Sequence, residues 1–97
     1  MLKKINSKSE FDSTIKNGVW LVDFFAKWCG PCRMLEPVIE SVSKNHNVIQ
    51  VDIDEAEEIT TEYGIMSVPT LIVFKDGELK SKAVGYMPEE EITNLLK

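Results

Sequence analysis

The only two cysteines of the 97-residue chain, Cys29 and Cys32, stand three positions apart in the stretch FFAKWCGPC. Two thiols at this spacing can form a structural bridge, supply half of a metal site or act as a redox couple. A bridge that closes so short a loop removes little entropy from the unfolded chain, so it adds little stability. A structural zinc site needs four nitrogen or sulfur ligands, and His46 is the only histidine. The pattern therefore favours reversible thiol–disulfide chemistry.

The elements on either side of the cysteines indicate how the pair is positioned. VWLVDFF, residues 19–25, is a nearly continuous apolar run, which is typical of a central strand covered on both faces. After the CxxC pair the apolar residues recur at helical spacing, which predicts a helix from about Cys32 to Lys44 with Pro37 inside it. A CxxC pair beside a strand–helix–strand pattern is the expected arrangement of a redox motif.

The start of that helix predicts different roles for the two thiols. Residues three apart on a helix lie about 5–6 Å from each other, which is within reach of a disulfide. Unpaired backbone amides and the positive end of the helix dipole favour the thiolate of the first cysteine, and only the thiolate attacks. Cys29 is therefore the candidate nucleophile and Cys32 the candidate resolving thiol.

Strand-like and helix-like segments alternate along the rest of the chain. We expect further strands at about 3–6, 48–53, 70–74 and 78–84, and further helices at 8–17 after a Ser7-x-x-Glu10 capping box, from an Asp54 cap to about Gly64, and from Pro88 onward. The strand–helix–strand order predicts a parallel pair for 19–25 and 48–53, while Lys75-Asp76-Gly77 predicts an antiparallel hairpin. The predicted fold class is α/β: a mixed five-stranded central sheet flanked on both faces by about four helices, in one domain spanning residues 1–97.

Composition excludes several classes of partner. Eleven Lys and Arg against sixteen Asp and Glu leave a net charge of −5, which argues against nucleic acid or an anionic membrane as a main partner. No apolar run approaches the length of a membrane span. The N-terminal MLKKINSKSEF has no apolar stretch behind its lysines, so no secretory signal is expected and the cytoplasm is the expected location.

Together these motifs closely resemble the thioredoxin family over nearly the whole chain. The resemblance rests on WCGPC after an apolar strand, on the proline-containing helix, and on the later SVPT and KDG. It implies the thioredoxin fold and a monomeric protein-disulfide reductase without a bound cofactor. It also implies recharging from NADPH through thioredoxin reductase, with clients of the ribonucleotide reductase, peroxiredoxin and methionine sulfoxide reductase classes.

Asp23 places a charge inside the predicted central strand, and two interpretations are open. It could face water at a strand edge, or it could be buried, with a raised pKa because burial disfavours the anion. A buried carboxyl near Cys32 could exchange a proton with that thiol. The resemblance implies the second interpretation. Two departures from the family pattern lie nearby: Phe25 replaces a common tryptophan, and Gln50 replaces a common lysine close to the buried aspartate, which leaves the pKa of Asp23 open.

The resemblance also implies a surface for client proteins. Trp28, in a loop beside the cysteines, is expected to form a flat apolar wall. Pro69 is expected to follow a cis peptide bond, which leaves the backbone of Val68 open to an extended client segment. The other residues expected at this surface are Gly30, Pro31 and Gly85.

Two rival functions are open at this stage. A thiol oxidase or isomerase of the same fold would run the chemistry in the other direction, although the Gly-Pro dipeptide between the cysteines is similar to that of reducing thioredoxins. Alternatively, the fold could serve as a binding module for a partner enzyme, with the thiols incidental.

Overall fold

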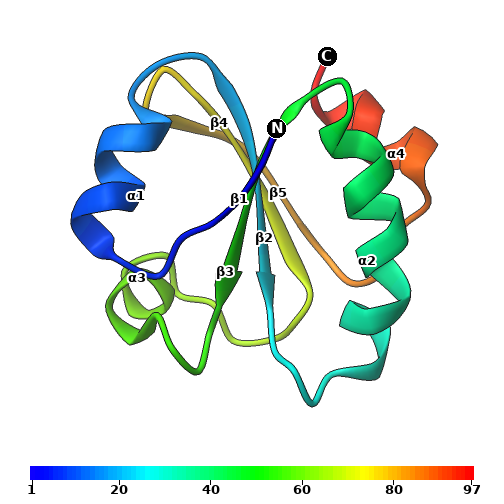
Figure 1. Ribbon diagram of the computed structural model, residues 1–97, viewed down its shortest axis with the longest axis horizontal. Coiled ribbons are helices and arrows are strands. Elements are labelled where there is room, and N and C mark those ends of the chain that lie inside the picture. Colours follow the sequence, from blue (N-terminus) through cyan, green and yellow to red (C-terminus); the bar gives the residue numbers. More distant parts are fainter.

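A computed structural model describes residues 1–97 as alternating strands and helices around one sheet (Figure 1). The strands are β1 (Leu2–Lys4), β2 (Val19–Phe25), β3 (Asn47–Asp52), β4 (Thr70–Lys75) and β5 (Glu78–Val84). The helices are α1 (Lys8–Ile15), α2 (Gly30–Ser43), α3 (Glu57–Glu62) and α4 (Glu89–Leu95). Every predicted element exists, and the bounds of β2 are those expected from the sequence. Shifts of about two residues occur at the start of α2, at the ends of β1 and α1, and at both ends of α3.

The five strands form one mixed sheet in the order β1-β3-β2-β4-β5. β3 pairs in parallel with both β1 and β2, whereas β4 is antiparallel to β2 and to β5. Both the parallel β2–β3 pair and the β4–β5 hairpin are as predicted. β2 therefore lies at the centre of the sheet, and its C-terminal end leads directly into the CxxC loop.

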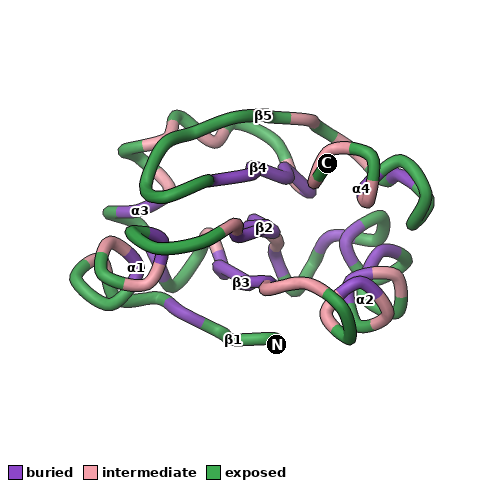
Figure 2. The backbone as a smooth tube through the Cα atoms, turned by 90° about the horizontal axis from the view of Figure 1, so that it is seen from above, coloured by how far each residue is buried: buried purple, intermediate pink, exposed green.

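Helices cover both faces of the sheet (Figures 1 and 2). α1 and α3 lie against one face, and α2 and α4 lie against the other. Because side chains alternate along a strand, β2 sends Trp20, Val22 and Phe24 into the α1/α3 core and Leu21 into the α2/α4 core. The first core contains 12 buried residues and the second contains nine.

The helix N-termini are built in different ways. Ser7 caps α1, since its hydroxyl oxygen accepts a hydrogen bond from the backbone amide of Glu10 at 3.4 Å. The prediction that Asp54 caps α3 is wrong: α3 begins after Ala56 and has no side-chain cap. Asp54 bonds elsewhere, as described below. Pro88, predicted at the first position of α4, is the residue just before the helix, and its side chain makes no capping bond.

The two edge strands of the sheet are unlike the strands between them. β1 is only three residues long, and all three are exposed. β5 is exposed along most of its length and carries Lys80 and Lys82. Its hairpin turn places Asp76 and Gly77 at positive φ, 50° and 87°, which is the backbone that a tight two-residue hairpin requires.

Candidate active site

Cys29 and Cys32 lie at the N-terminus of α2 and are joined by a disulfide bond, with their Cα atoms 5.3 Å apart. Cys29 is the N-cap residue of the helix. Its Sγ accepts a hydrogen bond from the backbone amide of Cys32 at 3.2 Å. A sulfur atom thus takes the place of the usual capping oxygen, and the amides at the helix start favour negative charge on it. Both sulfur-bearing residues are buried, together with Ala26.

A second loop closes over the pair from the start of β4. The Val68–Pro69 peptide bond is cis, as the family resemblance implies. The carbonyl oxygen of Val68 lies 3.6 Å from the Sγ of Cys29. Gly85, directly after β5, has φ of +100°, and its backbone amide donates a hydrogen bond to the carbonyl oxygen of Pro69 at 2.8 Å. The structure therefore brings Val68, Pro69 and Gly85 together beside the disulfide.

Trp28 stands out from the surface directly before Cys29. Its side chain is 66% exposed, so it is not part of either core. The indole Nε1 donates a hydrogen bond to Oδ2 of Asp54 at 2.9 Å, across 26 positions of sequence. Asp54 follows the end of β3, and its backbone amide donates a hydrogen bond to Oδ1 of Asp52, the last residue of that strand, at 2.9 Å. The ring is thus held by a hydrogen bond although it is open to solvent.

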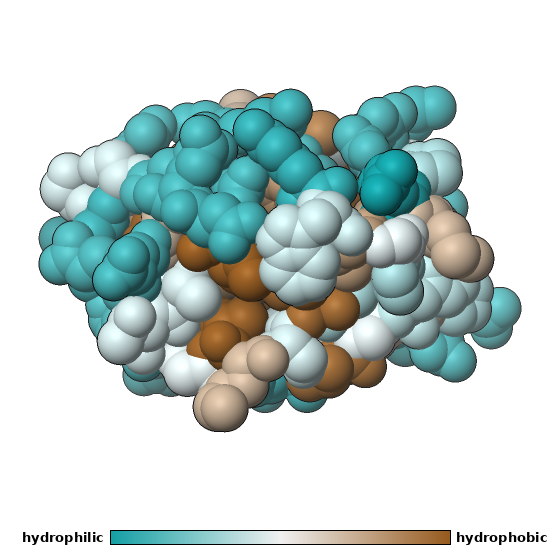
Figure 3. Space-filling view, turned by 90° about the horizontal axis from the view of Figure 1, so that it is seen from below, coloured by the Kyte–Doolittle hydropathy of each residue, from teal (hydrophilic) through white to brown (hydrophobic).

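Further apolar side chains are exposed near this end of the molecule. Met66 is 95% exposed and lies two residues before Val68, and Met34 on the first turns of α2 is 64% exposed. Figure 3 views the end that carries the β2–α2 loop, and hydrophobic residues gather in the middle of that face, bordered by hydrophilic ones. Met34 recurs at helical spacing with buried residues such as Leu35, so the sequence pattern did not predict its exposure, and the only signal for Met66 was its place in the Gly64–Pro69 loop.

Asp23 is buried on the α2 face of β2, with 2% of its surface exposed, so the edge-strand interpretation is wrong. Its Oδ1 atom has no hydrogen-bond partner. Burial raises the pKa of Asp23 to about 7. Gln50 is the neighbour of Asp23 on β3, and a hydrogen bond from its side-chain amide opposes this rise in pKa. The negative charge of Glu36 adds to the rise. The pKa of this carboxyl therefore lies close to neutral pH instead of in the usual acidic range.

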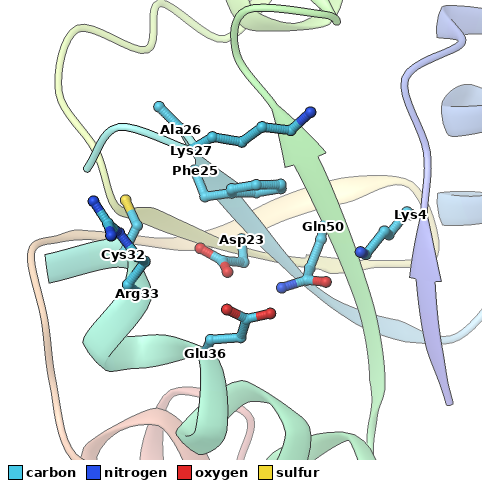
Figure 4. Close-up of a pocket in the computed structure, with 9 residues that line it drawn as sticks. All are labelled: Lys4, Asp23, Phe25, Ala26, Lys27, Cys32, Arg33, Glu36 and Gln50. Atoms are coloured by element: carbon cyan, nitrogen blue, oxygen red, sulfur yellow. The ribbon is translucent and has the colours of Figure 1, made fainter. Parts of the chain in front are cut away.

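A cavity of about 290 Å³ connects Asp23 with Cys32 and with solvent-exposed charges. Figure 4 shows the carboxylates of Asp23 and Glu36 pointing toward one another, with the side-chain nitrogen of Gln50 directed at the space beside them. The complete lining comprises Lys4, Asp23, Phe25, Ala26, Lys27, Cys32, Arg33, Glu36 and Gln50. A cavity with polar walls of this size can hold water, so Asp23 and Cys32 share an environment in which a proton can pass between them.

The predicted site residues thus fall into two groups around the disulfide. Trp28, Val68, Pro69 and Gly85 lie on the outer side, and Asp23 lies behind it in the cavity. Gly30 and Pro31 are the first two residues of α2, and both are exposed.

The structure contains no group of three or more His, Cys, Asp or Glu side chains placed to hold a metal ion. None of the four helices has the length and apolar character needed to cross a membrane.

Comparison with known proteins gives the same family at the level of sequence and of structure. The family model for thioredoxin matches residues 3–97. A thioredoxin of Staphylococcus epidermidis is 47% identical over 92 residues, which cover 91% of this chain and 88% of the relative. Among solved structures, a point mutant of thioredoxin from Halobacterium salinarum is 39% identical, with a TM-score of 0.92, covering 98% of this chain and 87% of that one.

One further structural neighbour comes from a structure that concerns a peroxiredoxin. It belongs to a structure that describes thiol resolution in a yeast mitochondrial 1-Cys peroxiredoxin via glutathione and thioredoxin systems. That chain is 30% identical with a TM-score of 0.85, and the match covers 97% of this chain and 92% of that one.

Proposed function

The chain belongs to the thioredoxin family, and we propose that in this protein-disulfide reductase Cys29 is the attacking thiol and Cys32 the resolving thiol. The observation that supports this assignment most directly is the cap of α2. Cys29 is the residue whose sulfur accepts the helix amide, so its thiolate is favoured over that of Cys32.

The reaction then has two exchange steps. The Cys29 thiolate attacks one sulfur of a client disulfide, a mixed disulfide forms, and the other client sulfur leaves as a thiolate that takes up a proton. Cys32, after losing its proton, attacks the Sγ of Cys29, and the second client sulfur leaves with the bonding electron pair and is protonated. The client gains two electrons and two protons, and the protein is left with the Cys29–Cys32 disulfide.

Asp23 is proposed to take the proton of Cys32 in the second step. A general base works best when its pKa is near the working pH, and the pKa of Asp23 is raised to about 7. Both groups line the same cavity, whose polar walls suit a bridging water.

The client is proposed to bind as an extended segment over the outer side of the disulfide. Val68 would supply backbone hydrogen bonds in the manner of strand addition, while Pro69 and Gly85 hold that loop beside Cys29. Trp28, Gly30 and Pro31 would supply further exposed contact surface beside the disulfide.

The wider setting is proposed from the family. Residues 1–97 would act as one domain in the cytoplasm, with no bound cofactor, and thioredoxin reductase would return electrons from NADPH. Clients would include peroxiredoxins, a class supported by the yeast structural neighbour, together with ribonucleotide reductase and methionine sulfoxide reductase.

The direction of the chemistry is tested by the equilibrium reduction potential of the Cys29–Cys32 couple, measured against glutathione and dithiothreitol buffers by tryptophan fluorescence. A value well below the cytosolic glutathione pool is expected for a reductase. A value well above that pool would make the protein a donor of disulfides and would replace the proposal with the oxidase or isomerase function.

The assignment of the two thiols is tested by serine variants. Cys32→Ser should accumulate a mixed disulfide with a client at Cys29, because the resolving thiol is missing. Cys29→Ser should form no such adduct, although serine still caps the helix and the fold is retained. Adduct formation by Cys29→Ser would reverse the proposed roles. Client binding that survives in the double-serine variant, with no effect of the cysteines on the partner's activity, would favour the binding-module function.

A further inference from the structure

Glu36 directs its carboxylate into the cavity that contains Asp23, although the residue itself is exposed on α2 (Figure 4). It stands four residues after Cys32, so the two side chains lie on the same face of the helix. That face turns toward the polar end of β2 and β3. The helix thus presents to one cavity both the resolving sulfur and a carboxylate.

The other groups that face Asp23 do not neutralise this pair of carboxylates at close range. Gln50, directly across from Asp23 on β3, is uncharged. The cations around the cavity are exposed, as Glu36 is, but of these charged groups only the carboxylate of Glu36 is directed at Asp23 (Figure 4). From the elements packed around Asp23, the charged and titratable lining groups are Lys4 of β1, Lys27 of the loop after β2, and Cys32, Arg33 and Glu36 of α2.

We propose that Glu36 is a positioning residue for the resolving step: facing Asp23 across the cavity, it sets the pH range in which Asp23 takes the proton of Cys32. The inference rests on the proposed role of Asp23. A negative charge beside a buried carboxylate makes the neutral form more favourable, so it strengthens Asp23 as a proton acceptor. It also means that at slightly acidic pH Asp23 is already protonated in a larger fraction of the molecules, and in those molecules it cannot act as a base.

Glu36 changes only how tightly Asp23 holds the proton, and it contacts none of the reacting sulfur atoms. The Cys32 thiol gives its proton to Asp23, its sulfur bonds to the Sγ of Cys29, and the client sulfur leaves with the electron pair. Asp23 then releases the proton to solvent through the cavity, and Glu36 alters the affinity of Asp23 for that proton.

The test compares three variants of α2 in the intact protein. Glu36→Gln removes the charge with nearly the same shape, and Glu36→Lys reverses it. Glu40→Gln is the matched control, because Glu40 is an exposed glutamate one turn further along the helix that does not line the cavity. Carboxyl-carbon NMR follows the titration of Asp23 in the oxidised protein, and single-turnover kinetics follow release of a client peptide from the mixed disulfide as pH is varied.

We expect Glu36→Gln to lower the pKa of Asp23 by about one unit and Glu36→Lys by about twice as much, as charge removal and charge reversal at a partly screened site imply. The midpoint of the pH profile for client release should move to lower pH by the same amounts. Glu40→Gln should leave both quantities unchanged.

A pKa of Asp23 that falls no further in Glu36→Gln than in Glu40→Gln would overturn the inference. Asp23→Asn separates this failure from failure of the proposed function. If Asp23→Asn abolishes the pH dependence of client release while the Glu36 variants do nothing, the role of Asp23 stands and that of Glu36 falls. If Asp23→Asn leaves the profile of the wild-type protein intact, both are wrong.

Discussion

The two faces of the sheet are built from the same strands but differ at one end. Under α1 and α3 the inward positions of β2 are apolar from Trp20 to Phe24, and aromatic side chains there pack edge to face, as Phe11 does with Phe74 at 5.8 Å between ring centroids. The face under α2 and α4 begins in the same way, with Leu21 and Val48 buried side by side. At the next inward positions of those two strands stand Asp23 and Gln50, and the packing opens into the cavity.

This difference shows how a small domain can combine a stable core with a reactive site. The polar end of the α2 face costs stability, because a carboxyl oxygen is buried there without a partner. The α1/α3 face has no such cost and supplies the compensating apolar burial. Both sides of the sheet have an apolar core, but the buried polar site is on one side only, and β2 contributes to both sides through alternate residues.

The largest expected effect comes from breaking the apolar face. Phe11→Ala should lower the free energy of unfolding by about 3–5 kcal/mol, because a fully buried ring is replaced by a cavity. Urea denaturation measures the loss, and Leu79→Ala at an exposed position of β5 serves as a control with little expected change. Disulfide exchange per folded molecule should stay at the wild-type rate, and a fall in that rate would contradict the division between the two faces.

An effect of opposite sign is expected on the other face. The pKa of Asp23 is raised from 3.8 to about 7 in the folded protein, so the folded protein holds this proton more tightly than the unfolded chain does. The ionised carboxylate therefore lowers the free energy of unfolding. The cost is absent below about pH 4, grows as pH rises toward 7, and then levels off at roughly 4 kcal/mol. Since Asp23→Ala also leaves a void that costs about 2 kcal/mol at any pH, we expect a net gain of about 2 kcal/mol at pH 7.5 and a net loss of about 2 kcal/mol at pH 4.

Denaturation of oxidised wild-type protein and of Asp23→Ala at those two pH values measures this gain. Client release should slow in the variant while the fold becomes more stable. Equal stability differences at both pH values would show that the carboxyl is not the source of the cost. Asp23→Asn, which keeps the shape without the charge, should show the same loss of pH dependence as Asp23→Ala.

The smallest effect is expected at the exposed Trp28–Asp54 hydrogen bond, which belongs to neither face of the sheet. Asp54→Ala removes the acceptor of the Trp28 hydrogen bond, and a typical net value of about 1 kcal/mol predicts a fall of about fivefold in kcat/KM for a protein client. Reduction of a small soluble disulfide should be unaffected, because it does not need the ring. Glu58→Ala on α3 is the control, and an equal loss with both substrates would show that Trp28 does not act through client contact.

The sequence predicted the parts of the fold that depend on neighbouring residues. The bounds of β2, the Ser7 cap and the Asp76–Gly77 turn each follow from a short local pattern, and the structure confirms all three. The CxxC pair was recognisable for the same reason, since its spacing and its place between a strand and a helix are both local.

The contacts that sequence reasoning missed join residues far apart in the chain. Asp54 has the pattern of a helix cap, but a tryptophan donor 26 positions earlier takes its carboxylate. Glu36 reads as one charge among several on an exposed helix, and its orientation toward Asp23 is visible only once α2 is packed on the sheet. Local propensity cannot specify either pairing, because both depend on which elements the fold brings together.

The edge strands of the sheet have a consequence for the protein at high concentration. A reductase of this kind is proposed to recognise extended client backbone, and the same tendency could let its own sheet grow from molecule to molecule. β1 offers only three residues for such pairing, and β5 carries lysines along its open side. Short and charged edges are poor templates for another strand. Self-association through the sheet edges is therefore disfavoured in crowded solution. Backbone pairing with clients is expected only at the Val68 loop beside the disulfide.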